Sequence, residues 1–411
     1  MSSVLAVLRG EPRARWFLLA NAQSTIGSGA AIVALMVLAL DRMGSAWAVS
    51  LVLLADFLPS MLLGPLFGAA ADRWSRRACA IVADLLRAGA FVGIGLTHSF
   101  AATVALATLA GVGTALFTPA VLAALPSLAH PDRSAAVTSL YGATRDIGRT
   151  LGPLLAAIAF PLIGAENLMI VNGVTFAISA LVIALIPFGE TGRDADAPER
   201  PSILREAREG LGLTWHLPGV QVVLWASTLV IVFAGMVNVG ELPLSRHLGA
   251  GDSGFAVLMV GMGLGVVTGS LLGARGGTLR AMKPRYLAGI LLVAISLIAL
   301  AAAPSYATAL VAFFGLGLGN GVVVVHERLI FHAAVPARIM GRAFAVLDTL
   351  GGWGFAAAFI GAGAIIDALG TRAMFAIAGA GALVIWGFAT LSLRRVWQGS
   401  TPTVARARDG G

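Results

Sequence analysis

Apolar stretches long enough to cross a bilayer fill almost the whole of this 411-residue chain. A helix needs about 20 mostly apolar residues to cross the hydrocarbon core. Because lipid offers no hydrogen-bond partners, the backbone of such a stretch must form a helix. Twelve of these stretches can be marked, and only 12% of the residues are charged, whereas 58% are hydrophobic. We therefore expect an all-α membrane protein with twelve transmembrane helices, since a soluble helical protein does not need so many uninterrupted apolar runs.

The expected helices fall into two sets of six, separated by the longest polar interruption of the chain. They span 15–40, 46–71, 78–97, 101–125, 135–162 and 167–188, then 220–244, 254–274, 286–303, 306–333, 340–366 and 373–393. The interruption is polar at first and then has the pattern of a short amphipathic helix on the membrane surface. The predicted units are an N-terminal six-helix bundle at 1–188, a cytoplasmic linker with that helix at 189–217, a C-terminal six-helix bundle at 218–395 and a cytoplasmic tail at 396–411.

The charges indicate topology. The net charge is +8, and most of the 28 Lys and Arg residues fall in alternate loops, beginning with the segment before the first span. This bias places both termini in the cytoplasm and predicts a multi-pass protein of the plasma membrane, not a nucleic-acid-binding protein. The single cysteine, Cys79, excludes an intrachain disulfide. No metal-ligand cluster, nucleophile set or phosphate loop is visible, so we expect neither an enzyme nor a cofactor, and an ion or substrate gradient must supply the energy.

Short repeats relate the two halves. The segment GPLFGA from Gly64 recurs as GSLLGA from Gly269. At the same separation, HPDR ending at Arg133 recurs as VPAR ending at Arg338. Two matches at one offset, in equivalent places of a six-plus-six layout, indicate duplication and hence pseudo-symmetric bundles. Repeats of this kind are a transporter architecture, in which the substrate binds near the membrane midplane.

The loop after the second span carries the most specific motif. The sequence GAAADRWSRR resembles the signature of the major facilitator superfamily, and the matching positions are Gly68, Asp72, Arg73, Arg76 and Arg77. The resemblance implies the major facilitator fold and a gating role for this segment. In the family the segment holds the halves together in the outward-facing state by gripping helix 11, a role that we carry to Asp72 and Arg73. The copy in the second half has Gly277 at the position of Asp72, so the gate is expected in one half only.

The fifth span carries a second family motif. GRTLGPLLAA resembles the antiporter motif of the drug-exporting branch, with Gly148, Gly152 and Pro153 in place and Ala156 and Ala157 where the family has glycines. Small residues four apart allow close helix contact, and proline permits a bend. Over its full length the chain resembles the exporter group that holds macrolide-efflux and enterobactin-exporter proteins, and this resemblance favours export.

Ionisable residues inside the spans are costly and are therefore functional candidates. Asp56 lies about 14 Å from the outer end of its span, at 1.5 Å per residue. With no basic residue within one turn, its carboxyl is expected to take up and release a proton; the alternative is a permanently neutral acid hydrogen-bonded to a neighbour. Asp146 and Glu327 are the other proton-coupling candidates. Asp146 can instead pair with Arg149, and Glu327 can belong to an inner gate with Asp348.

Several further polar residues lie within the spans. The cavity candidates are Asn21, Gln23, Arg145, Asn238 and Glu241. Asp84 and Arg87, three residues apart, are expected to form a structural ion pair.

These patterns together predict a secondary active transporter, specifically a proton-coupled exporter, or antiporter, of amphipathic small molecules such as drugs or a siderophore. One alternative is a proton symporter or uniporter that imports a small nutrient. A second is a lipid-handling protein or a non-transporting membrane receptor. The expected partners are the substrate, protons and membrane lipids, and we expect a monomer.

Overall fold

The computed structural model describes residues 7, 9–71, 74–188, 217–274 and 278–396, and every regular element in those ranges is a helix. Eleven helical stretches there are long and apolar enough to cross a membrane. The longest contains helix α6 (Ser134–Leu185), whose 52 residues are broken at Gly164, where the backbone has φ 76° and ψ 171°. Because this break divides α6 into two crossing helices, the described residues contain twelve spans, as the sequence predicts.

The other helices follow the expected spans closely. The first half contains α2 (Pro12–Met43), α3 (Ala46–Ala71), α4 (Arg76–Leu96), α5 (Phe100–Ala124) and α6. The second half contains α8 (Pro218–Gly235), α9 (Val237–His247), α10 (Gly251–Gly273), α11 (Leu279–Ala302), α12 (Tyr306–Ala334), α13 (Met340–Leu369) and α14 (Thr371–Val396). Helices α8 and α9 form one span interrupted at Met236, a break that the apolar pattern does not reveal.

Local signals explain the short connections. Helix α2 ends at Gly44, which adopts φ 69° and donates its N–H to the Leu40 carbonyl; this left-handed conformation favours glycine. Ser99 caps α5, and Ser305 with Thr308 forms a capping box at the start of α12. These caps satisfy the first N–H groups of the helices, so that a few residues are enough to reverse the chain.

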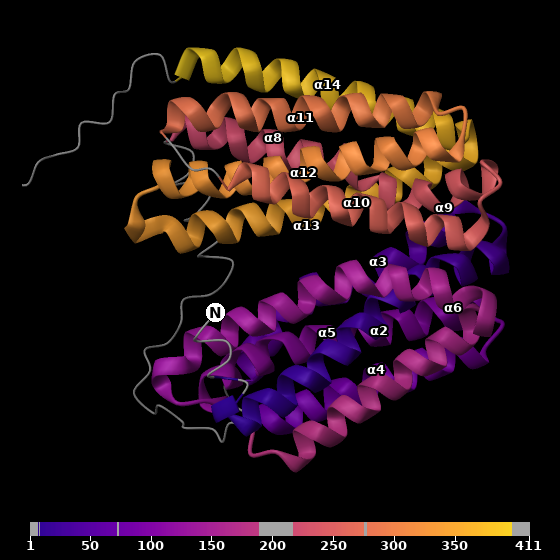
Figure 1. Cartoon of the computed structure of the whole chain (residues 1–411), viewed down its shortest axis with the longest axis vertical. Helices are drawn as coiled ribbons and strands as arrows, with labels where there is room; N and C mark the ends of the chain where they lie inside the picture. Colours follow the sequence, from indigo (N-terminus) through magenta and orange to yellow (C-terminus); the bar gives the residue numbers. More distant parts are fainter. Residues whose placement is uncertain (1–6, 8, 72–73, 189–216, 275–277, 397–411) are drawn as a thin grey trace, which may run out of the picture.

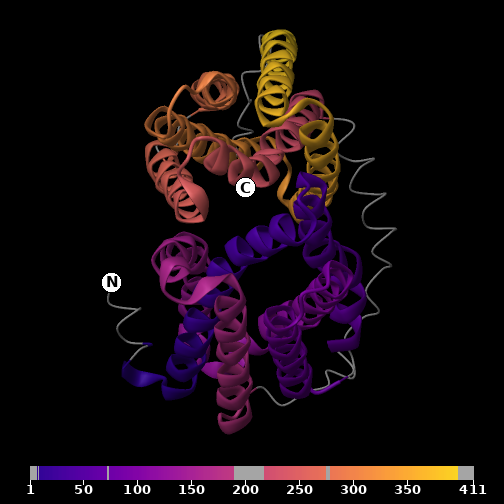
Figure 2. The ribbon, with the colours of Figure 1, turned by 90° about the vertical axis from the view of Figure 1, so that its right-hand side faces the viewer.

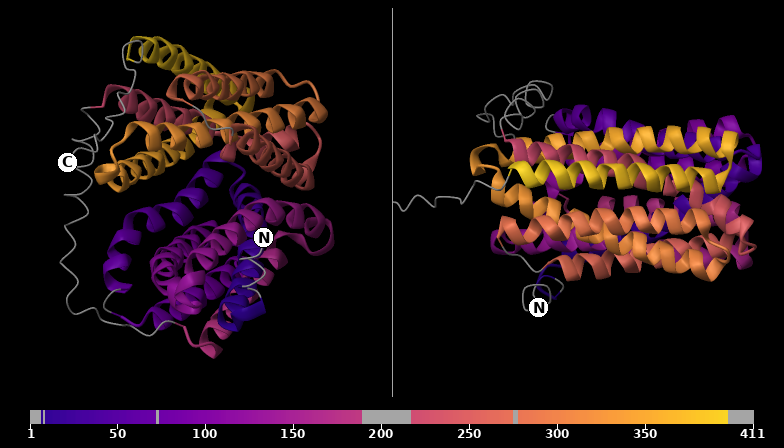
Figure 3. Two further views of the ribbon diagram at one scale, coloured as in Figure 1. Left: turned by 60° about the vertical axis from the view of Figure 1, so that its left-hand side comes forward. Right: turned by 90° about the horizontal axis from the view of Figure 1, so that it is seen from above.

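The helices form two groups, α2–α6 and α8–α14, which appear as separate clusters when the molecule is viewed from one end (Figure 2). The long axes of the helices run in roughly the same direction in both groups (Figure 3). We call the end where α2 begins and α14 ends the terminal end, and the end where α2 is followed by α3 the opposite end. In Figure 1 the two groups approach each other at the opposite end and diverge towards the terminal end.

Large apolar side chains cover the outside of both groups. Val311 and Val384 are each 72% exposed, and Leu162 is 76% exposed. A surface of this kind is stable only in contact with lipid. The described helices therefore form a multi-pass membrane protein. The predicted linker helix, Asp72, Arg73 and Gly277 lie outside the described residues.

Candidate functional site

A cavity of about 410 Å³ lies inside the first half of the molecule. Its walls come from α2, α3, α4, α5 and α6, and all of its lining residues lie between Asn21 and Phe176. The lining combines polar side chains of α2 with aromatic rings from α4, α5 and α6. The cavity therefore has the mixed lining of a small-molecule site.

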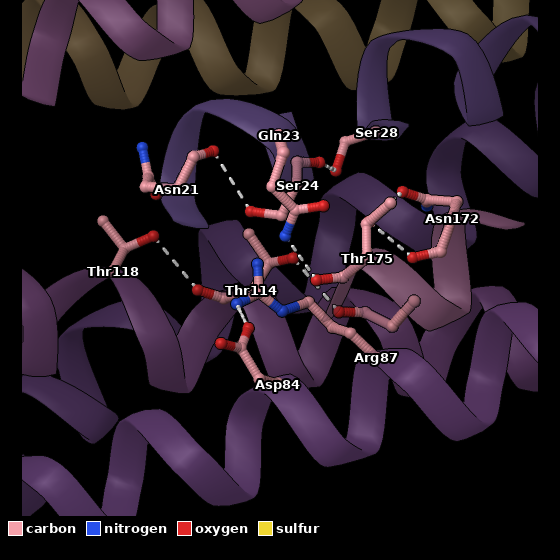
Figure 4. A network of polar contacts seen from close by, with 11 residues as sticks. Asn21, Gln23, Ser24, Ser28, Asp84, Arg87, Thr114, Thr118, Asn172 and Thr175 are labelled. Atoms are coloured by element: carbon pink, nitrogen blue, oxygen red, sulfur yellow. Dashed lines mark hydrogen bonds and ion pairs between the residues drawn. The ribbon is translucent and has the colours of Figure 1, made fainter. Parts of the chain in front are cut away.

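The polar side is a stripe along α2. Ser24 and Thr25 lie three and four residues after Asn21, and Ser28 lies four and three residues after them, so all four share one face of the helix. The Asn21 amide donates to the Thr144 hydroxyl at 2.6 Å, and the Thr25 hydroxyl donates to the Thr144 carbonyl at 3.0 Å. The stripe thus joins α2 to α6 and lines the cavity with hydroxyl and amide groups. Figure 4 shows three of its members, Asn21, Ser24 and Ser28.

Arg87 of α4 also lines the cavity. It makes an ion pair with Asp84 one turn earlier, which confirms the predicted pair. The rings of Phe117 and Phe176 lie 4.1 and 4.3 Å from the guanidinium carbon. Cation–π contact with two rings and an ion pair hold this group in one position. Its Nε has no hydrogen-bond acceptor among the described residues. The sequence did not indicate that Arg87 also lines the cavity, because Phe117 and Phe176 are remote from it in the chain.

Asp56 of α3 lines the same cavity. It does not form an ion pair with Arg87, although both side chains face one space. The approach of α3 to α5 depends on Gly111, since a Cβ there would lie 2.3 Å from the Asp56 carbonyl oxygen. Asp56 has no basic neighbour on its own helix, but tertiary packing places Arg87 and Arg145 on the walls of its cavity.

The other candidates of the first half are arranged around this cavity. Asn21 and Arg145 line it. Gln23 does not; its amide donates to the Thr175 carbonyl at 2.7 Å and so joins α2 to the second part of α6. Asp146 is exposed and is not part of the lining. The side chain of Arg149 is outside the described set, so its pairing with Asp146 remains a prediction.

The candidates of the second half lie apart from the cavity. Glu327 of α12 is 9% exposed, and Ser227 of α8 hydrogen-bonds both its carboxyl and, at 2.7 Å, the hydroxyl of Tyr286 in α11. Glu241 of α9 is 2% exposed. The Asn238 amide donates to the Gly235 carbonyl at 2.8 Å. The structure therefore does not bring Glu327, Glu241 or Asn238 together with Asp56.

The antiporter motif supports the cavity wall. A Cβ at Gly148 would lie 2.6 Å from the Thr25 carbonyl, and a Cβ at Gly152 would lie 2.4 Å from the Cα of Gly29. These contacts join backbone to backbone, so only glycine permits this approach of α6 to α2. Pro153 follows within the same helix. Because Thr25 and Gly29 line the cavity, the motif sets the position of the polar stripe.

The gating motif lies at the terminal end. The Arg76 guanidinium donates to the Ala123 carbonyl at 2.9 Å, and Arg77 donates to the carbonyls of Ile183 and Ala184. These two arginines therefore cap the ends of α5 and α6, where the helix dipole favours a cation. A Cβ at Gly68 would meet only Pro119, at 4.0 Å. These contacts of the described motif residues stay within the first half.

Contacts between the halves are concentrated towards the opposite end. Asp367, near the end of α13, accepts hydrogen bonds from the Ser45 hydroxyl and from the N–H groups of Ala46, at 2.9 Å, and Trp47, at 3.4 Å. It thus caps α3, which belongs to the other half. Deeper along α3, the Ser50 hydroxyl donates to the Phe359 carbonyl at 2.6 Å.

Arg246 makes a second link between the halves at this end. Its guanidinium pairs with Asp41 of α2 at 2.7 Å and with Asp252 of α10 at 2.7 Å. Neither Arg246 nor Asp367 was predicted from the sequence to be a functional residue. The available signal was the placement of each of these charges at or near the end of an apolar span.

Comparisons with known proteins agree with this architecture. A family model described as "Major Facilitator Superfamily" matches residues 17–282. The chain belongs to this superfamily. It is therefore a membrane transporter and not an enzyme, and the predicted family resemblance is confirmed.

Two relatives are named as efflux proteins. The multidrug efflux pump Tap of Mycolicibacterium fortuitum is 28% identical over 376 residues, which cover 85% of this chain and 88% of that protein. Macrolide efflux protein A of Streptococcus pyogenes is 23% identical over 223 residues, which cover 53% of this chain and 55% of that protein.

Solved structures share the fold. A variant of the nucleoside transporter NupG has a TM-score of 0.78 at 10% identity and covers 92% of this chain and 99% of its own. A bacterial homologue of the human lysosomal transporter Spinster, in an inward-facing and unoccupied conformation, has a TM-score of 0.71 at 15% identity, covering 94% and 98%. Similarity at these identities supports the fold alone.

Proposed function

We propose that this transporter is a proton-coupled exporter of amphipathic small molecules in the plasma membrane, with its terminal end in the cytoplasm. The observation that carries the proposal is the Asp56 carboxyl, which lines a cavity that combines polar side chains of α2 with aromatic rings. The efflux function in the names of the two relatives supports the direction of transport. The distribution of Lys and Arg supports the orientation.

The charge of Asp56 can couple the movement of protons to the movement of substrate. An ionised side chain in the middle of the bilayer costs about 2.5–3.5 kcal/mol even on lenient scales. An uncompensated Asp56 carboxylate would therefore disfavour the closed intermediate between the two access states by roughly 10²-fold. A proton or a bound substrate removes that penalty. Because either one suffices, the protein changes access with one or the other bound, and this alternation is antiport.

The conformation of the structure fits one step of that cycle. Asp367 and Arg246 join the halves at the opposite end, whereas the ribbons diverge at the terminal end (Figure 1). In the proposed orientation the linked ends face outward, and the ends where the ribbons diverge face the cytoplasm, where an exporter takes up its substrate. The proposed gate at Asp72 and Arg73 would form in the other access state, when the terminal ends meet.

The test is Asp56→Asn in inverted membrane vesicles loaded with a panel of fluorescent dyes and antibiotics. Asparagine resembles the protonated acid in shape but cannot release a proton. We expect the variant to bind and exchange substrate down its gradient and to lose transport driven by a pH gradient. Asp132→Asn, at a carboxyl that is 88% exposed, is the matched control and should remain fully active. Uphill, pH-driven transport by Asp56→Asn would refute the proposal and pass the role to Asp146 or Glu327.

A further inference from the structure

The charged side chains at the cavity differ in whether they can pair with a ligand. Asp84 and Arg87 neutralise each other in an ion pair, and aromatic rings cover the guanidinium. Asp56 and Arg145 also line the cavity, and neither has an ion-pair partner among the described residues. Among the residues that the structure describes, the cavity therefore offers a ligand one carboxyl and one guanidinium without an ion-pair partner.

These two groups lie at different depths. Asp56 is ten residues into α3, about 15 Å from the opposite end at 1.5 Å per residue. Arg145 precedes the break at Gly164 by 19 residues, which places it about 28 Å from the same end. The two charges are thus separated by on the order of 10 Å along the bundle axis, too far for an ion pair with each other.

The rest of the described lining is amphipathic. It includes the hydroxyls of Ser24, Thr25 and Ser28 and the rings of Phe91 and Phe176. The rings of Phe91 and Phe176 stack with centroids 5.6 Å apart and an interplanar angle of 11°. This arrangement suits a flat, largely apolar body with polar edges.

We propose that the cavity selects amphipathic zwitterions, with the cationic group of the ligand against Asp56 and its anionic group against Arg145. This proposal rests on the proposed function in taking the cavity as the substrate site. It adds that a carboxylate on the substrate is a favourable feature. A singly charged cation would satisfy Asp56 and leave Arg145 without a partner.

The experiment measures equilibrium binding to the purified full-length protein in detergent, by fluorescence anisotropy. A rhodamine with a free benzoate is a zwitterion, its methyl ester is a cation of nearly the same shape, and fluorescein supplies an anion. We expect the zwitterion to bind about tenfold more tightly than the ester, the lower range for a charge-assisted contact, because Arg145 is exposed.

Variants separate the two contacts. Arg145→Gln should weaken the binding of the zwitterion about tenfold and leave the binding of the ester unchanged, so that the preference for the zwitterion over the ester disappears. Asp56→Asn should weaken the binding of the zwitterion and of the ester, because both carry a cationic group, and should leave the binding of fluorescein unchanged. Arg372→Gln is the matched control, because Arg372 lies in the second half and donates to the Ala303 carbonyl; it should change nothing. Thermal denaturation of each variant reports whether it folds.

The outcomes decide between this proposal and the proposed function. Equal binding of zwitterion and ester by the natural protein, a preference that survives in Arg145→Gln, or binding of none of the dyes would overturn the zwitterion proposal. Because the assay contains no gradient, failure of pH-driven export in vesicles would overturn the coupling mechanism alone. Export of cationic dyes without any zwitterion preference would retain the proposed function and reject this inference.

Discussion

Asp367 offers the most direct test of how the two halves are held together. Its carboxylate is the N-terminal cap of α3, although it belongs to α13 in the other half. Loss of such a cap costs about 0.5–2 kcal/mol, and loss of a negative charge at a helix N-terminus about 0.3–1 kcal/mol. Since Asp367 is exposed, water replaces part of the interaction, and we take about 1–2 kcal/mol for Asp367→Ala.

This energy acts on access and not on folding, because the contact exists only while the opposite ends of the halves meet. A change of 1–2 kcal/mol alters an equilibrium by roughly 5- to 30-fold. We therefore expect Asp367→Ala to shift the population towards the state open at the opposite end by that factor, with each bundle remaining folded.

The assay is pulsed electron paramagnetic resonance between spin labels on cysteines that replace His98 and Pro304. Both residues are exposed at the opposite end, one in each half. Cys79→Ala removes the only native cysteine. Asp367→Ala should increase the fraction of molecules that show the longer of two distances between the labels. Asp132→Ala, a matched change far from the contact, should not. An unchanged distance distribution in Asp367→Ala would show that the cap does not hold the halves together.

Two further predictions concern packing and topology. Gly152→Ala places a Cβ 2.4 Å from the backbone of Gly29, so we expect the free energy of unfolding to fall by about 1–3 kcal/mol, measured by thermal denaturation. Gly142→Ala in the same helix, where nothing lies within 4 Å of the new Cβ, should not change stability. Equal stability of the two variants would contradict the close approach of α6 to α2. Reporter fusions after Asp194 should read as cytoplasmic and those at Gly251 as external. The same reading at both sites would disprove the twelve-span model between them, and reversed readings would disprove the proposed orientation.

The fold was largely predictable because the solvent imposes it. The expected span at 46–71 has the observed bounds of α3, and the span at 306–333 differs from α12 by one residue. Hydropathy reports length and burial in lipid, which these helices share. It does not report backbone breaks inside an apolar run, and for this reason the interruption at Met236 went unnoticed.

The candidate site was predictable only in part. The depth of Asp56 in its span singled it out, because depth follows from distance along one helix. The position of Arg87 on the cavity wall could not be predicted in this way. Its pairing with Asp84 already accounted for a charged residue inside the span, so there was no reason in the sequence to place it in a site. Its contacts with Phe117 and Phe176 depend on how three helices pack, and packing is determined by side-chain shape across the bundle. The same limit applies to Asp367, whose partners lie more than 300 positions earlier in the chain.

All residues that line the cavity belong to the first half of the chain. Under the proposed function, substitutions in α2–α6 alter which molecules are recognised, whereas those in α8–α14 alter how fast the carrier turns over. The range of substrates can then change during evolution through substitutions in α2–α6, without compensating substitutions in α8–α14. A chimera joining the first half of this chain to the second half of a relative should inherit this chain's half-saturation concentrations and the relative's maximal rate.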